Sequence, residues 1–96
     1  MLFMVIEHLD PARVGEVYAR FGARGRLAPE GVRYVDSWIA ADLSRCFQIM
    51  ECDDVALLQQ WVLAWSDLVR FEIVPVAGST QTAAAVKAAA GVTAAV

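Results

Sequence analysis

An acid flanked by aromatic residues is the strongest candidate for chemistry in this chain. Six aromatic and polar residues alternate along two neighbouring extended segments: Tyr34, Asp36, Trp38, Cys46, Gln48 and Met50. A carboxyl group partly removed from water has a raised pKa, which suits Asp36 to general acid–base catalysis. We expect Asp36 to be a catalytic group and the other five to bind a ligand. The alternative is that Asp36 forms a hydrogen bond or ion pair in a dimer interface.

His8, the only histidine, is a second candidate catalytic group. It could act as a base or as a haem ligand, since one histidine suffices as a proximal ligand. A surface position without function is the alternative. No second histidine accompanies it, so no zinc site is expected. Cys46 and Cys52 would lie roughly 20 Å apart along one strand, too far for a mutual disulfide. We expect packed thiols, no metal and no cofactor.

The two segments predict a β-hairpin with strands at residues 32–39 and 45–51. Pairing Trp38 with Cys46, Asp36 with Gln48 and Tyr34 with Met50 places all six residues on one face, as the pleat requires. That face is expected to turn away from the helices. It would then be either a pocket wall or the seam of a dimer.

The surrounding elements predict the fold. A strand is expected at Leu2–Glu7, followed by a helix with Asp10 as its N-cap and Pro11 at its first position. A second helix, capped by Asp53 or Asp54, is expected to run to about residue 68, and a strand to follow at Arg70–Val76. This order is the split βαβ pattern of ferredoxin-like α+β folds, with a four-stranded antiparallel sheet. Residues 1–78 therefore form one domain, and residues 79–96 an alanine-rich C-terminal helix or tail. Its larger anchors are Val86, Val92 and Val96.

Composition narrows the function classes. The hydrophobic fraction of 58% is high for 96 residues, which favours a homodimer that covers apolar surface. The net charge of −3 disfavours nucleic-acid binding, and no apolar run is long enough to span a membrane. Free thiols without an export signal predict a cytoplasmic protein. A basic cluster at Arg20, Arg24 and Arg26 is expected to be a solvated helix end rather than an anion-binding loop.

Several motifs together resemble a known family. They are Met1-Leu-Phe-Met-Val-Ile-Glu7, Arg24-Gly-Arg26, Pro29-Glu-Gly31, Tyr34-Val-Asp-Ser-Trp38, Arg45-Cys-Phe-Gln48, Met50-Glu51, Trp61, Trp65-Ser-Asp-Leu68, Phe71-Glu72 and Val74-Pro-Val76. The set is similar to the bacterial domain of unknown function 3303 family over residues 1–76. The resemblance implies a dimeric α+β barrel of ferredoxin-like protomers and a bacterial origin. It transfers no catalytic residue.

Three functions are compatible with these features. The first is a cofactor-free enzyme that acts on a small apolar or aromatic molecule, with Asp36 as proton carrier. The second is a non-catalytic sensor that binds such a molecule. The third is a dimerisation module whose cavity is filled by its own side chains. The first two predict an open cavity beside Asp36, and the third predicts none.

Overall fold

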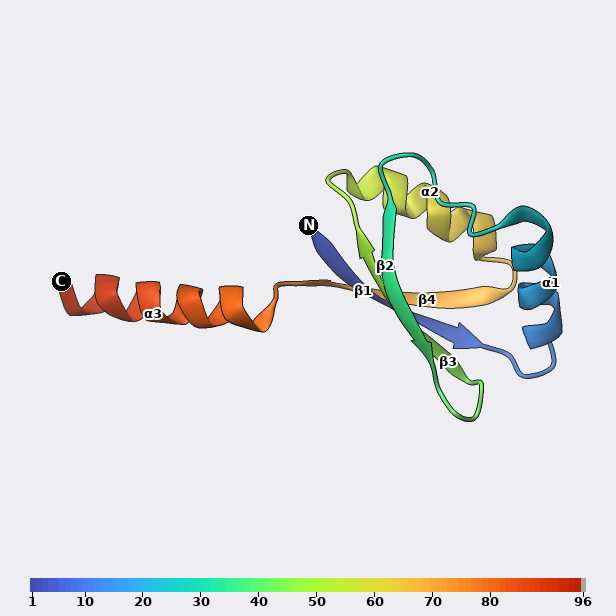
Figure 1. Ribbon diagram of the computed structural model, residues 1–96, viewed down its shortest axis with the longest axis horizontal. Helices are drawn as coiled ribbons and strands as arrows, with labels where there is room; N and C mark the ends of the chain where they lie inside the picture. The colour runs from blue at the N-terminus through green and yellow to red at the C-terminus, as the bar shows by residue number, and fades with distance from the viewer. Residues whose placement is uncertain (96) are drawn as a thin grey trace.

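Four antiparallel strands and two helices form the body of the molecule, and a third helix extends from it (Figure 1). The computed structural model describes residues 1–95, with side chains for residues 1–91. The elements are β1 (Leu2–Leu9), α1 (Val14–Arg24), β2 (Arg33–Ile39), β3 (Arg45–Glu51), α2 (Val55–Trp65), β4 (Val69–Val76) and α3 (Ser79–Ala95). The strand order is β2-β3-β1-β4, with antiparallel pairing throughout. The predicted ferredoxin-like α+β fold is confirmed.

The two helices of the body begin differently from each other. Asp54 caps α2 as expected, because its side chain accepts a hydrogen bond of 2.9 Å from the backbone N–H of Ala56. Asp10 was expected to cap α1, and this expectation is wrong. Its carboxylate accepts from the N–H of Ala12 at 2.9 Å, which closes a turn, and α1 begins only at Val14. The helix therefore begins about one turn later than the sequence predicts.

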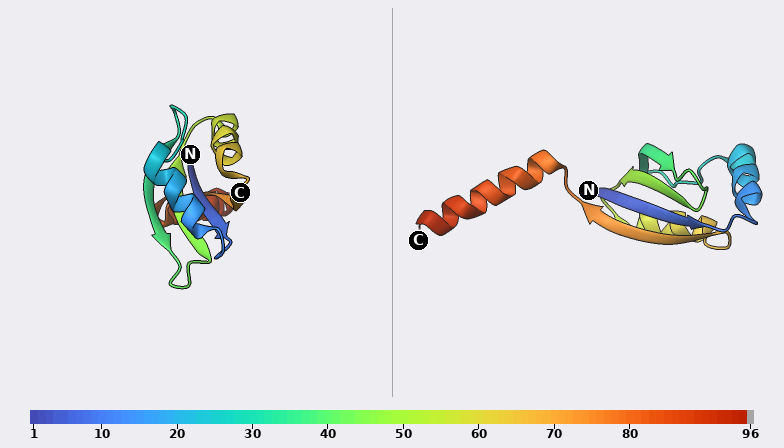
Figure 2. Two further views of the ribbon diagram at one scale, coloured as in Figure 1. Left: turned by 90° about the vertical axis from the view of Figure 1, so that its right-hand side faces the viewer. Right: turned by 90° about the horizontal axis from the view of Figure 1, so that it is seen from below.

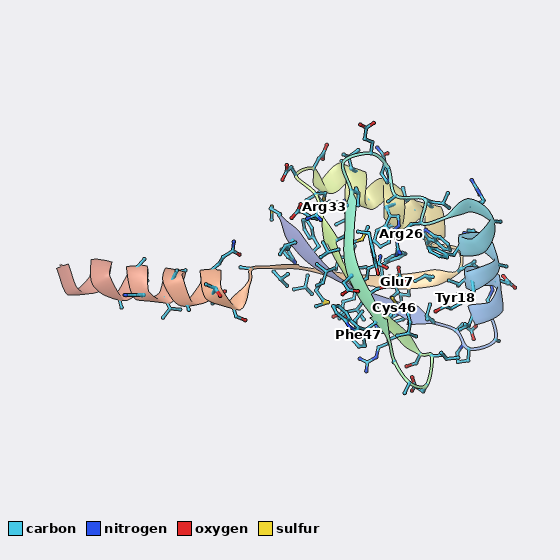
Figure 3. The ribbon with its side chains drawn as sticks, viewed as in Figure 1. Glu7, Tyr18, Arg26, Arg33, Cys46 and Phe47 are labelled. Atoms are coloured by element: carbon cyan, nitrogen blue, oxygen red, sulfur yellow. The ribbon has the colours of Figure 1, made fainter. Side chains whose placement is uncertain are left out.

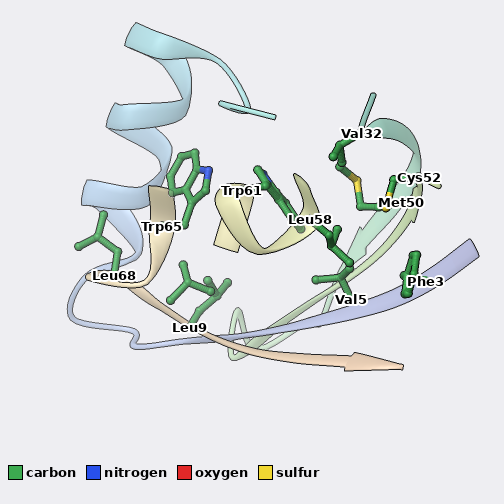
Figure 4. Packing of buried hydrophobic residues seen from close by; sticks show 11 residues of the cluster. Phe3, Val5, Leu9, Val32, Met50, Cys52, Leu58, Trp61, Trp65 and Leu68 are labelled. Carbon is green, nitrogen blue, oxygen red and sulfur yellow. The ribbon is translucent and has the colours of Figure 1, made fainter. Parts of the chain in front are cut away.

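The core lies between α2 and one face of the sheet (Figure 4). Inward positions of β1 alternate with outward ones, so Phe3 and Val5 are buried. Opposite them Trp61 is 1% exposed, and its ring meets that of Phe71 edge-to-face at a centroid distance of 5.4 Å. Burial of these large side chains supplies most of the favourable free energy of folding.

Helix α1 stands at the end of the sheet rather than over it (Figures 1 and 2), and it has no buried residue. Arg20 fastens it to α2 through a hydrogen bond of 3.0 Å to the carbonyl oxygen of Ala64. Two further hydrogen bonds of 2.8 and 2.7 Å reach the carboxylate of Asp67, just after α2. The Arg20 guanidinium lowers the pKa of Asp67 to about 2. Because α1 is held at this end, the helices cover only part of the sheet face formed by β2 and β3.

The hairpin register differs from the predicted one. Tyr34 pairs with Met50 as expected, but Asp36 pairs with Ile49 instead of Gln48. The shift falls at Val35, where one extra residue in β2 forms a β-bulge. Side chains alternate along a strand, so this single residue moves the rest of β2 to the opposite face.

The expectation that all six hairpin residues share one face is therefore wrong. Gln48 and Met50 are buried on the face that α2 covers, at 2% and 0% exposure. Asp36 and Trp38 point to the other face, and both are exposed. The predicted orientation away from the helices holds for these two residues and not for the residues of β3.

The face opposite α2 is called the open face here. Cross-strand pairing places eight apolar side chains on it: Leu2, Met4, Ile6, Trp38, Phe47, Ile49, Val74 and Val76. Trp38 is 55% exposed and Val74 is 43% exposed. Pro75 lies in β4, which is an edge strand as its proline suggests.

Helix α3 extends away from the body of the molecule (Figures 1 and 2). Every side chain described in it, at residues 79–91, is exposed. Of the expected anchors, Val86 is 65% exposed. The side chain of Val92 and the whole of Val96 lie outside the described residues. The alanine-rich segment is therefore helical over its described length without burying its larger side chains.

Candidate functional site

A pocket of about 230 Å³ lies between the sheet, α1 and α2. Its apolar and aromatic lining consists of Leu9, Val17, Tyr18, Phe21, Ile39, Trp61 and Trp65. Its polar lining consists of Glu7, Arg26, Ser37, Cys46 and Gln48. A dry cavity of about 150 Å³ accommodates benzene, so this pocket has room for one substituted ring. The position of α1 at the end of the sheet leaves this space unfilled.

Glu7 is the acidic residue of the pocket. It occupies an inward position of β1, where the alternation of Phe3 and Val5 would place an apolar side chain. Burial raises the pKa of its carboxyl group above the ordinary 4.5, while a hydrogen bond with Cys46 and the charge of Arg26 lower it less strongly. Figure 3 shows Glu7, Cys46 and Arg26 grouped beside α1. A buried carboxyl group in such a setting holds its proton to a higher pH than an exposed glutamate does.

Arg26 reaches the pocket from the loop between α1 and β2. Two indole N–H groups hold this loop, because Trp61 and Trp65 both donate to the carbonyl oxygen of Arg26, at 3.1 and 2.8 Å. On either side of it Gly25 and Leu27 have positive φ angles of 70° and 62°. This backbone conformation is sterically unfavourable for Leu27, and the two hydrogen bonds from α2 help to maintain it.

The Arg26 side chain is held at its faces and at one edge. Its guanidinium lies 3.7 Å from the ring centroid of Tyr34 and 5.3 Å from that of Phe21. One edge donates a hydrogen bond of 2.7 Å to the Oε1 atom of Gln48. Gln48 in turn donates from Nε2 to the sulfur of Met50 at 3.4 Å. Stacking and hydrogen bonding together fix the cation inside a largely apolar layer.

Cys46 is a packed thiol rather than a nucleophile. Burial raises its pKa to about 12, and the negative charge of Glu7 adds to the effect. A nucleophilic cysteine needs a lowered pKa, which this environment opposes. Both Cys46 and Cys52 are free and buried, in agreement with the absence of a mutual disulfide.

The Cys46 thiol is expected to resist alkylation in the folded protein. A pKa of about 12 against the ordinary 9.0 lowers the thiolate fraction about a thousandfold at neutral pH. Higher intrinsic nucleophilicity offsets part of this, so labelling by iodoacetamide should be at least about tenfold slower than in urea. The Cys52→Ala variant isolates the Cys46 thiol for the measurement. Equal rates in the folded and unfolded protein would contradict the prediction.

The structure separates the residues expected to form one site. Gln48 and Cys46 line the pocket, and Tyr34 touches it through its stacking on Arg26. Met50 belongs to the core. Asp36 and Trp38 lie on the open face and do not line this pocket. The Asp36 carboxylate accepts from the backbone N–H of Ser37 at 2.8 Å.

His8 also lies on the open face, near the end of β1. Its Nε2 atom is 3.5 Å from a carboxylate oxygen of Glu72 but lacks hydrogen-bond geometry to it. Its cross-strand neighbours are Arg45 and Arg70. His8 and the pocket carboxyl of Glu7 are adjacent in sequence and therefore point to opposite faces of the sheet.

Sequence reasoning missed Glu7 and Arg26 as site residues. Glu7 could have been found, because a carboxyl at an inward position of an apolar strand breaks the period-two pattern. Arg26 was expected at a solvated helix end. Its true position depends on the loop that Trp61 and Trp65 anchor, which no local pattern reveals.

The described residues contain no group of three or more His, Cys, Asp or Glu side chains able to hold a metal ion. None of the helices in that part of the chain has the length and hydropathy to span a membrane.

No curated protein and no solved structure matches the sequence. Residues 1–90 match the family described as Domain of unknown function (DUF3303), which extends the expected resemblance into α3. The chain belongs to this family.

Proposed function

We propose that the protein is a homodimer that binds a small, largely apolar or aromatic molecule in the pocket between the sheet, α1 and α2. The observation that carries the proposal is one pocket with aromatic walls and a fixed pair of opposite charges, Glu7 and Arg26. Ligand sites typically combine apolar walls with a few placed polar groups that orient the ligand. The alternative of a dimerisation module with a filled cavity concerns the face that carries Asp36, which lies across the sheet from this pocket.

The open face supports the dimer. Soluble monomers rarely expose a large contiguous apolar patch, and here Trp38, Phe47 and Ile49 lie side by side across β2 and β3. Twofold symmetry is the commonest arrangement of homo-oligomers, and it would place two such faces against each other. The pocket lies on the other side of the sheet, so each protomer would retain its own site.

Cofactor-free proton transfer is the second candidate function. Glu7 favours it, because burial raises the pKa of this carboxyl group towards the range useful for general acid–base catalysis. Arg26 would stabilise negative charge on the same molecule. Asp36 and His8 remain candidates for a separate site on the open face, which a second protomer would enclose.

Ligand-observed NMR with benzyl alcohol and phenol as probes tests the binding proposal. Ile39 lines the pocket and is 40% exposed, so Ile39→Trp should obstruct it and weaken probe binding at least about tenfold. Val55→Trp is the matched control, because Val55 is 49% exposed on α2 and does not line the pocket. Absence of probe binding to the natural protein, or equal binding to the Ile39→Trp variant, would refute the proposal.

The Asp36→Asn variant distinguishes the two sites. If the pocket is the ligand site, the variant should bind both probes as the natural protein does, because Asp36 lies across the sheet. Loss of probe binding in this variant would instead assign the ligand to the open face.

A further inference from the structure

Two charged side chains line the pocket, one of each sign. Glu7 lies on β1, and Arg26 is its cationic neighbour. The other titratable groups that face it are the thiol of Cys46 on β3 and the phenol of Tyr18 on α1. The cross-strand neighbour of Glu7 on β4 is Phe71, and α2 contributes the rings of Trp61 and Trp65 to the pocket. The pocket of the free protein is therefore electrically balanced by a single pair.

The Arg26 guanidinium has donors left for a ligand. Tyr34 and Phe21 occupy its faces, whereas its N–H groups point outwards in its plane. Within residues 1–91 its side chain makes one hydrogen bond, from Nη1 to Gln48. A carboxylate can accept two parallel hydrogen bonds from such an edge, which a hydroxyl group cannot.

We propose that the pocket takes a small aromatic or aliphatic monocarboxylate together with one proton, the carboxylate on Arg26 and the proton on Glu7. The inference rests on the proposed function, since it uses the same pocket. A bound carboxylate alone would leave two negative charges against one positive charge in an apolar layer, which is costly. One proton taken from solvent neutralises Glu7, so the complex is balanced like the free pocket.

The affinity for a carboxylate should therefore fall as the pH rises. Burial raises the pKa of Glu7, so the folded protein holds this proton to a higher pH than an exposed glutamate does. Below that pKa the proton is already present, and the carboxylate binds without proton uptake. Above it each pH unit weakens binding up to about tenfold, because one proton must come from solution. A neutral alcohol needs no proton and should bind equally at all pH values.

Calorimetric titration of benzoate and benzyl alcohol between about pH 6 and pH 9, where benzoate is ionised, tests the inference. Benzoate affinity should fall once the pH exceeds the pKa of Glu7, and buffers of different ionisation enthalpy should reveal a proton uptake that rises towards one as the pH increases. The Glu7→Gln variant should bind benzoate without pH dependence, and Arg26→Gln should bind it at least about tenfold more weakly. Glu30→Gln, in an exposed loop position, is the control and should keep the pH dependence.

The outcomes separate this inference from the proposed function. Benzoate binding that is independent of pH and takes up no proton would overturn the inference, while benzyl alcohol binding would still support the pocket. If neither benzoate nor benzyl alcohol binds the natural protein, both the proposed function and the inference are wrong. If the Glu7→Gln variant does not fold, the proton uptake measured on the natural protein decides the question.

Discussion

Replacement of Trp61 by alanine is expected to lower the free energy of unfolding by about 3–5 kcal/mol, the usual cost of truncating a large buried aromatic side chain. Trp61 is 1% exposed and loses its edge-to-face contact with Phe71. The indole N–H that donates to the Arg26 carbonyl at 3.1 Å is lost as well. Small domains have about 5–15 kcal/mol of stability in total, so the variant should be close to unfolding.

Urea unfolding followed by circular dichroism measures this effect. Leu63→Ala is the matched control, because Leu63 lies on the same helix and is 73% exposed. Its cost should stay within about 0.5 kcal/mol, as for most surface substitutions. A loss below about 1 kcal/mol for Trp61→Ala would show that α2 does not anchor the core in the way described.

The fold was predictable because its strongest signals are local. Asp54 caps α2 where the sequence places a cap, and the alternation of Phe3 and Val5 identifies the inward face of β1. Asp10 misled the prediction of α1, since the same carboxylate that caps a helix also closes a turn. Element type followed from these patterns, whereas some boundaries did not: α1 begins later than predicted, α2 ends at Trp65 rather than near residue 68, and β1 continues to Leu9.

The candidate site was harder to predict because it depends on register and on a loop. A bulge at Val35 carries no sequence signal, yet it moves Asp36 to the face opposite Gln48. Arg26 enters the pocket only because a distant helix hydrogen-bonds its carbonyl oxygen. Glu7 is the exception, because a carboxyl group at an inward position of an apolar strand can be recognised from the sequence alone.

Introduction of a charge on the open face is expected to dissociate the proposed dimer. Ile49 lies on β3, one of the two inner strands, and pairs with Met4 on β1 and Asp36 on β2. A glutamate at this position would place two carboxylates, one from each protomer, in the buried interface. A buried charge without a partner costs several kcal/mol, so the dissociation constant should rise at least about a hundredfold. Sedimentation equilibrium at micromolar concentration measures the change.

Leu63→Glu provides the matched control for this experiment. It introduces the same charge at an apolar position, but on the outer side of α2, where Leu63 is 73% exposed. Association should then be unchanged, and both variants should keep the circular dichroism of the natural protein because neither position is in the core cluster. A natural protein that sediments as a monomer would refute the dimer. Equal dissociation of both variants would show that the partner covers α2 or that net charge drives the effect, and the apolar side chains of the open face would then require another explanation.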